Sequence, residues 1–135
     1  MTEVQKLYED QWGSIWTNGS IVGIDWLPTT LDMVAADFQQ FLMTFADKIV
    51  ETNGRLAFVD VQPFRMDPAH MDGEWRDANI IPRYNEAGIK KFAFVMPQSM
   101  PLIGQQPTAE PPSVFLTGYF ASREDALNWL ADTVE

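Results

Sequence analysis

Two short apolar runs, RLAFVDV at residues 55–61 and KKFAFVM at residues 90–96, constrain the fold of this chain more than any other feature. Both contain little polar interruption, as expected of central strands that are buried on both faces of a sheet. A segment with helical character precedes each run, so strands and helices alternate along the chain. This alternation predicts right-handed crossovers between parallel strands, with helices packed on the sheet.

The strongest helical pattern lies between residues 28 and 54. Thr29 and Asp32 form a capping-box pattern at its start, and Asn53-Gly54 suits a left-handed stop at its end. Apolar side chains recur at helical spacing and predict one buried stripe. The stripe consists of Leu31, Val34, Phe38, Phe41, Leu42, Phe45 and Ile49.

The segment from residue 8 to residue 27 predicts an antiparallel hairpin, because two runs rich in Ile, Val and Trp flank TNGS. A two-residue type I′ turn at Asn18-Gly19 fits this pattern. The turn pairs Trp16 with Ile21, Ile15 with Val22, Gly13 with Ile24 and Trp12 with Asp25. One face of the hairpin then carries Trp12, Trp16 and Ile21, which is unusually aromatic for a solvent-exposed surface. We expect this face to be covered, either by a second copy in a homodimer or by the chain's own N-terminal residues.

The rest of the chain completes an α/β pattern. A helical region at residues 68–87 ends at Gly88, and Pro82 must kink it or begin a new turn. The stretch 97–112 is rich in proline and long for a plain connection, so we expect a lid or a mobile loop there. A last strand, SVFLTGYF, and a helix that Ser122 and Asp125 cap complete the chain. The predicted architecture is a single domain, residues 1–135, with a mostly parallel sheet and an antiparallel hairpin at its edge.

Composition excludes several functions. The chain has 135 residues, no cysteine and a net charge of −10. Thiolate chemistry and disulfides are therefore absent, and the acidic surface disfavours nucleic acid and anionic lipid headgroups. No apolar run is long enough to span a membrane, and the acidic N-terminus lacks the basic start of a signal peptide. A cytoplasmic location is the expectation.

The segment after the first central strand holds four carboxylates and the chain's single histidine: Asp60, Asp67, His70, Asp72 and Glu74. An oxygen-rich cluster at a strand end suits magnesium, so one interpretation is a metal-dependent hydrolase or phosphatase that uses Asp60, Asp67 and Asp72. The simpler interpretation makes Asp67 a helix N-cap, followed by acids that the helix dipole favours. No nucleophile elbow, phosphate-binding glycine motif or histidine pair accompanies the cluster. The simpler interpretation is preferred, with no enzyme activity, metal or cofactor expected.

Three stretches, LAFVDV…MDPA, NEAGIKKFAFVMP and GYFASREDALNWL, resemble the SpoIIAA-like or STAS-like domains, and through them the fold group of the SEC14-type lipid carriers. The resemblance covers about residues 16–131. In that family the loop after the central strand carries a serine that a partner kinase phosphorylates. The matching positions here are Met66, Asp67, Pro68 and Ala69, so the phospho-acceptor serine is absent and the resemblance implies a fold rather than a sigma-factor switch.

The sequence therefore predicts a small, non-enzymatic binding or protein-interaction module of STAS-like fold. We expect a homodimer. The long loop and the helix after Asp67 either hold a lipophilic small molecule, because apolar loops that contain methionine adapt to varied ligands, or these residues only fill the core under a surface loop. The predicted pocket consists of Trp75, Tyr84, Met96, Met100, Leu102 and Ile103.

Overall fold

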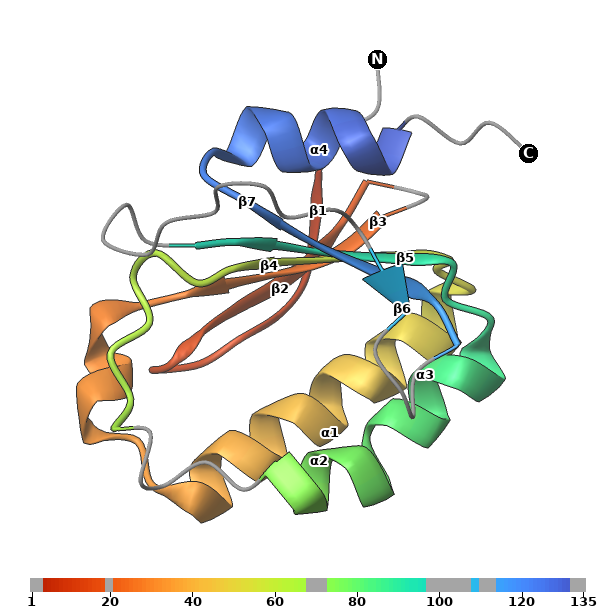
Figure 1. Cartoon of the computed structure of the whole chain (residues 1–135). Helices are drawn as coiled ribbons and strands as arrows, with labels where there is room; N and C mark the ends of the chain where they lie inside the picture. Colours follow the sequence, from red (N-terminus) through yellow and green to blue (C-terminus); the bar gives the residue numbers. More distant parts are fainter. Residues whose placement is uncertain (1–3, 19–20, 68–72, 97–107, 110–113, 132–135) are drawn as a thin grey trace.

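The chain folds into a seven-stranded sheet with helices on both faces, as the computed structural model in Figure 1 shows. The structure describes residues 4–18, 21–67, 73–96, 108–109 and 114–131. The strands are β1 (Gln5–Glu9), β2 (Gly13–Thr17), β3 (Ile21–Trp26), β4 (Leu56–Asp60), β5 (Lys91–Val95), β6 (Thr108–Ala109) and β7 (Leu116–Phe120). The helices are the 3₁₀ turn η1 (Pro28–Asp32) and the α-helices α1 (Ala35–Thr52), α2 (Gly73–Asn79), α3 (Ile81–Ala87) and α4 (Arg123–Ala131). The α/β class predicted from the sequence is confirmed.

The sheet is mixed rather than mostly parallel. Its order is β1-β2-β3-β4-β5-β7-β6. The central pairs β3–β4, β4–β5 and β5–β7 are parallel, whereas β1–β2, β2–β3 and β6–β7 are antiparallel. The additional antiparallel pairs come from two strands that the sequence did not predict, β1 at one edge and the short β6 within the long loop.

The N-terminal segment forms a three-stranded meander instead of the predicted hairpin. The chain bends between β1 and β2, where the Asp10 carboxylate accepts hydrogen bonds from the Trp12 backbone N–H at 2.8 Å and the Tyr8 hydroxyl at 2.8 Å. The predicted strand from residue 8 to residue 17 is therefore interrupted. β1 then turns back to pair with the outer edge of β2.

The predicted register between β2 and β3 is wrong by two residues. Trp16 pairs with Gly23 rather than with Ile21. Asn18 pairs with Ile21 through its backbone N–H at 3.1 Å and its side-chain oxygen at 3.0 Å, which moves the turn one residue along the chain. The shift places the Trp16 indole over a residue without a side chain. Because the shift is even, Trp16 and Ile21 stay on the same face, as predicted.

The long helix begins later than its sequence pattern indicates. Residues 28–32 form the 3₁₀ turn η1, and α1 starts after Val34, whose backbone N–H donates to the Asp37 carboxylate at 3.2 Å. The capping box predicted at Thr29 and Asp32 is therefore wrong. Leu31 and Val34 fall outside the buried stripe and are exposed.

The end of α1 and the helical region that follows agree with the sequence patterns. Asn53 ends α1 in the left-handed conformation with φ of 56°. Pro82 opens the separate helix α3, which ends at Gly88 with φ of 86°. The predicted helix start at Pro68 lies outside the described residues.

Among the described elements, α1, α2 and α3 cover one face of the sheet and α4 covers the other. The chain steps in one direction from β3 through β4 to β5, so right-handed crossovers place α1, α2 and α3 on the same face. α4 follows β7 and packs on the opposite face (Figure 1). Each face has its own buried cluster: aromatic rings dominate the one beneath α1, while the smaller one includes Phe58, Ala126 and Leu130 beneath α4.

The aromatic face of the hairpin is buried within the chain. Trp16 is 5% exposed and Ile21 is 6% exposed, and both belong to the cluster beneath α4. The Trp16 ring lies 5.5 Å from the Phe58 ring. Trp12 does not share this face, because it packs against the cluster beneath α1. The predicted dimer interface of Trp12, Trp16 and Ile21 is therefore wrong, because α4 and β4 cover Trp16 and Ile21.

Candidate functional site

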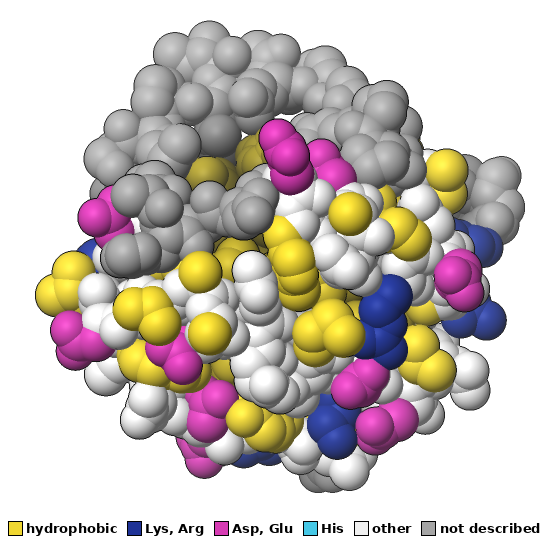
Figure 2. Space-filling model, turned by 90° about the horizontal axis from the view of Figure 1, so that it is seen from below, with side chains coloured by type: hydrophobic (Ala, Val, Ile, Leu, Met, Phe, Trp, Pro, Cys, Tyr) yellow, Lys and Arg dark blue, Asp and Glu magenta, His cyan; other side chains and the backbone are white. Residues whose placement is uncertain are grey.

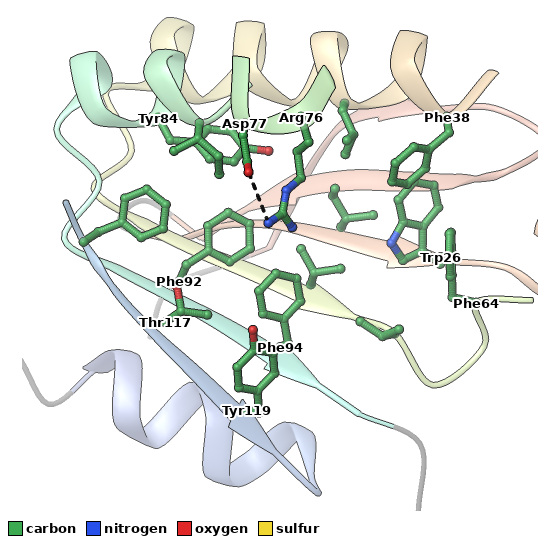
Figure 3. A pocket seen from close by; sticks show the side chains of 16 residues that line it. Trp26, Phe38, Phe64, Arg76, Asp77, Tyr84, Phe92, Phe94, Thr117 and Tyr119 are labelled. Atoms are coloured by element: carbon green, nitrogen blue, oxygen red, sulfur yellow. Dashed lines mark ion pairs between the residues drawn. The ribbon is translucent and has the colours of Figure 1, made fainter. Parts of the chain in front are cut away.

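An apolar cavity of about 210 Å³ lies between the sheet and the helix layer. Strands β3, β4, β5 and β7 form its floor, and α1, α2 and α3 form its roof (Figure 3). Its lining is mostly aromatic and aliphatic, with a few polar groups. The lining residues are Ile24, Trp26, Phe38, Leu42, Val59, Val61, Phe64, Arg76, Asp77, Ile81, Tyr84, Phe92, Phe94, Phe115, Thr117 and Tyr119.

Strand alternation explains the aromatic floor. Phe92 and Phe94 point toward the helix layer from β5, and their register partners Thr117 and Tyr119 point the same way from β7. The Phe94 ring stacks on the rings of Phe92 at 4.8 Å and Tyr119 at 5.4 Å. Parallel neighbouring strands therefore build a continuous row of rings beneath α2 and α3.

A second cluster of aromatic rings closes the end of the cavity at Trp26. The Trp26 ring at the end of β3 lies 4.9 Å from the Phe64 ring and 6.1 Å from the Phe38 ring. Phe64 reaches this position because the chain turns after β4, where its backbone N–H donates to the Val61 carbonyl at 3.0 Å. Segments that are distant in sequence thus meet at one wall of the cavity.

The polar part of the lining comes mainly from α2 and α3. Arg76 and Asp77 extend from α2 toward the rings on the sheet (Figure 3), and their charged atoms are 3.8 Å apart. Their side chains are 46% and 47% exposed, so they mark the side on which the cavity meets solvent. Tyr84 on α3 is only 3% exposed. Burial raises the pKa of Tyr84 strongly, and the positive charges of Arg76 and Arg83 counter part of that rise.

The helix-side surface is partly apolar. Figure 2 shows hydrophobic side chains on this face among acidic and basic ones. Exposed Met43 and Val50 on α1 belong to the apolar residues at the surface. A mixed surface of this kind is common in proteins, so the cavity is the more specific feature.

The predicted pocket shares one residue with this cavity, and the long loop that was to form one of its walls lies largely outside the described residues. Tyr84 lines the cavity. Trp75 packs half-buried against the same cluster, and Met96 is half-buried after β5, but neither is part of the lining. Met100, Leu102 and Ile103 lie outside the described residues.

The sequence interpretation missed the residues that contribute most to the floor, Phe92, Phe94 and Tyr119. Their signal was present in the alternation of FAF within 92–94 and of LTGYF within 116–120. In a strand that is buried on both faces every side chain is apolar, so the sequence does not show which side chains line a cavity. Arg76 carried no pattern that separated it from an ordinary surface charge.

The carboxylates considered as a metal site do not gather in the described part of the chain. Asp60 accepts hydrogen bonds from the Gln62 backbone N–H at 3.1 Å and from Arg123 at 3.3 Å. Asp67 is exposed, whereas His70 and Asp72 lie outside the described residues. Within the described ranges, no three side chains of the metal-binding types lie together. The structure thus gives Asp60 an ionic partner, Arg123, which it shares with Asp25.

No family model matches this chain, and no curated protein or solved structure is significantly similar to it. The STAS-like assignment therefore stays a prediction from the sequence motifs. Among the described residues, no helix combines the length and the apolar character that crossing a membrane requires.

Proposed function

We propose that this protein is a non-enzymatic binding module of STAS-like fold that holds a lipophilic small molecule between its sheet and its helix layer. The observation that carries the proposal is the aromatic-lined cavity of about 210 Å³. Native interiors are packed as densely as organic crystals, and voids larger than a water molecule are few. An apolar cavity with a solvent-facing side and a few polar groups is the usual form of a small-molecule site.

The arrangement supports binding more than catalysis. Phe38, Phe64, Phe94 and Tyr119 offer apolar area and ring faces, which favour an apolar ligand through burial and ring contacts. The cavity walls belong to the folded core, so the site is preorganised. A cytoplasmic carrier or sensor, either alone or as a homodimer, fits these properties.

Native mass spectrometry on gently purified protein tests the proposal. We expect an additional apolar mass on the wild-type chain, and its identity would name the ligand. Val61→Phe should abolish the retained mass, because Val61 lines the cavity and a larger ring there fills it. Val50→Phe is the matched control, since Val50 is exposed on α1 and away from this cavity.

Two results would count against a ligand carrier. One is a bare wild-type chain that also fails to bind any apolar probe in solution. The other is equal retention of the mass by both variants, which would place the molecule elsewhere. Either result would favour a module that binds a protein partner instead.

A further inference from the structure

We infer that the cavity is built for a small apolar molecule with a carboxylate, and that Arg76 binds the carboxylate at the α2 side. This inference rests on the proposed function and adds the chemical class of the ligand. It starts from the hydrogen bonding of the arginines.

Arg76 differs from the other arginines in its partners. Arg55 donates to the Ala87 carbonyl at 2.8 Å, Arg65 to the Gln62 carbonyl at 2.6 Å, Arg83 to Asp47 at 2.6 Å and Arg123 to Asp25 at 2.9 Å. Among the described residues, none accepts a hydrogen bond from the Arg76 guanidinium. A guanidinium is a planar group of five N–H donors that matches a carboxylate with two parallel bonds. The arginine that reaches into the apolar cavity is therefore the one with its donors unused.

Asp77 does not fill this role. Its carboxylate lies 3.8 Å from the Arg76 guanidinium, beyond hydrogen-bonding distance, and both side chains are about half exposed. An exposed pair at this distance contributes little attraction. A ligand carboxylate inside the cavity would meet the same guanidinium where less water screens the charge. The negative charge of Asp77 instead repels anions, so Asp77 should lower their affinity for the cavity.

Two hydroxyl groups add donors deeper in the cavity. Tyr84 and Thr117 both line it and are 3% and 5% exposed. Neither side-chain hydroxyl has a hydrogen-bond partner among the residues that the structure describes. Because both residues line the cavity, their hydroxyls are available to a polar atom of the ligand. Thr117 is the register partner of Phe92 and lies beside it on the floor (Figure 3).

The volume limits the apolar part of the ligand. An apolar protein cavity of roughly 150 Å³ holds benzene, whereas drug-sized ligands occupy sites of about 300–1,000 Å³. The value of about 210 Å³ lies just above the lower figure. The apolar part is therefore one ring or a short aliphatic chain, and a two-chain phospholipid is too large for the cavity as it stands.

Three probes with the same apolar body test the head group: phenylacetate, phenylethanol and phenethylamine, which are an anion, a neutral molecule and a cation. Isothermal titration calorimetry on the full chain at pH 7 measures each affinity. We expect phenylacetate to bind the wild type most tightly, and hexanoate to bind as well if a short chain is accepted. Arg76→Gln should weaken phenylacetate binding at least about tenfold and leave phenylethanol nearly unchanged.

Two further variants separate a local contact from overall charge. Lys6→Gln removes the same positive charge from exposed β1, away from the cavity, and should leave phenylacetate affinity unchanged. Asp77→Asn removes the competing carboxylate and should strengthen phenylacetate binding several-fold. Circular dichroism of each variant verifies that the fold is retained.

The outcomes distinguish the inference from the proposed function. Equal binding of phenylacetate and phenylethanol, unchanged in Arg76→Gln, would overturn the carboxylate inference and leave an apolar binding site. Tighter binding of phenethylamine, lost in Asp77→Asn, would assign the head-group role to Asp77 instead. Failure of all probes, together with a bare chain in native mass spectrometry, would overturn both.

Discussion

Gly23 is the residue that allows β2 and β3 to pair as they do. A Cβ atom at this position would lie 2.3 Å from Cζ2 and 2.5 Å from Cε2 of the Trp16 indole. These distances are shorter than side-chain contacts allow, and Trp16 is held on its other side by Phe58. The register of the meander and the burial of Trp16 therefore depend on the same missing side chain.

Gly23→Ala should lower the free energy of unfolding by about 1–3 kcal/mol, because the added methyl overpacks the cluster beneath α4. Urea unfolding followed by circular dichroism measures the change. In a Trp16→Leu background the penalty should be smaller, since the atoms that clash are gone. An equal penalty in both backgrounds would show that the clash is not its cause.

Tyr84 should make stability depend on alkaline pH. Burial raises its pKa above the ordinary value of 10.0, so the folded state holds the phenolic proton more tightly than the unfolded chain. This stabilisation is complete below a pH of about 10 and is lost as the pH rises through the folded pKa. The free energy of unfolding should therefore begin to fall near pH 10 and keep falling as the pH rises further.

Tyr84→Phe removes the ionisable group and should flatten this fall, as urea unfolding over the same pH range would show. Tyr8→Phe is the matched control. The pKa of Tyr8 is also raised, first by its hydrogen bond to Asp10, but its ring is less buried and it should affect the slope less. A slope unchanged by Tyr84→Phe would mean that the phenol already meets water in the folded state.

At the scale of elements, Arg123 links the start of α4 to the carboxyl ends of the neighbouring strands β3 and β4. Its guanidinium contacts Asp25 at 2.9 Å and Asp60 at 3.3 Å. The same group lies 4.8 Å from the Phe58 ring centre and 5.6 Å from the Trp16 ring centre. Parallel pairing of Asp25 with Asp60 brings two like charges together, and the arginine between them offsets their repulsion.

Arg123→Gln should lower the free energy of unfolding by about 1 kcal/mol, because two ion pairs and two ring contacts are weakened at a partly exposed site. The effect should shrink in high salt, which screens surface charges. Comparing Arg123→Gln, Asp60→Asn and the double variant by urea unfolding gives the coupling between the two residues. Additive effects would mean that the pair contributes no net stability.

The Asp60→Asn variant also tests the metal-dependent hydrolase interpretation. A magnesium-dependent activity that this substitution abolishes without unfolding the protein would support a catalytic Asp60. Under the proposed function, the change alters stability alone. A screen of phosphate esters and other hydrolysable substrates on both proteins decides between them.

At the scale of the whole molecule, the buried position of Trp16 changes what its substitution should do. If Trp16 formed an exposed dimer interface, the Trp16→Glu variant would be a soluble monomer. With Trp16 5% exposed beneath α4, the same change buries a carboxylate and should unfold the chain. Loss of the circular dichroism signal in this variant is the expected result, and a folded Trp16→Glu monomer would contradict the observed packing.

The homodimer stays a prediction, and its interface would lie elsewhere than Trp16 and Ile21. Sedimentation velocity on the wild type at micromolar concentration tests it directly. A monomer across that range would refute the dimer and leave the single chain as the binding unit.

The local elements were predictable because their signals lie in neighbouring residues. The apolar runs of β4 and β5, the amphipathic stripe of α1, the stop at Asn53 and the break at Pro82 each act through the backbone within a few positions. The register of β2 and β3 and the start of α1 were missed for a related reason. Each has two local patterns that fit the sequence about equally well. Tertiary contacts, such as that of the Trp16 indole with Gly23, favour one of them.

The sequence by itself determined the α/β class, the order of the main elements and the apolar character of both sheet faces, because strand and helix periodicity are local properties. Only the tertiary structure decided which of those side chains pack together and which line a cavity. Phe94 and Tyr119 meet through parallel pairing of β5 and β7, and Arg76 joins them through the placement of α2. Sequence spacing does not determine these contacts, because they depend on how the sheet and the helix layer pack against each other.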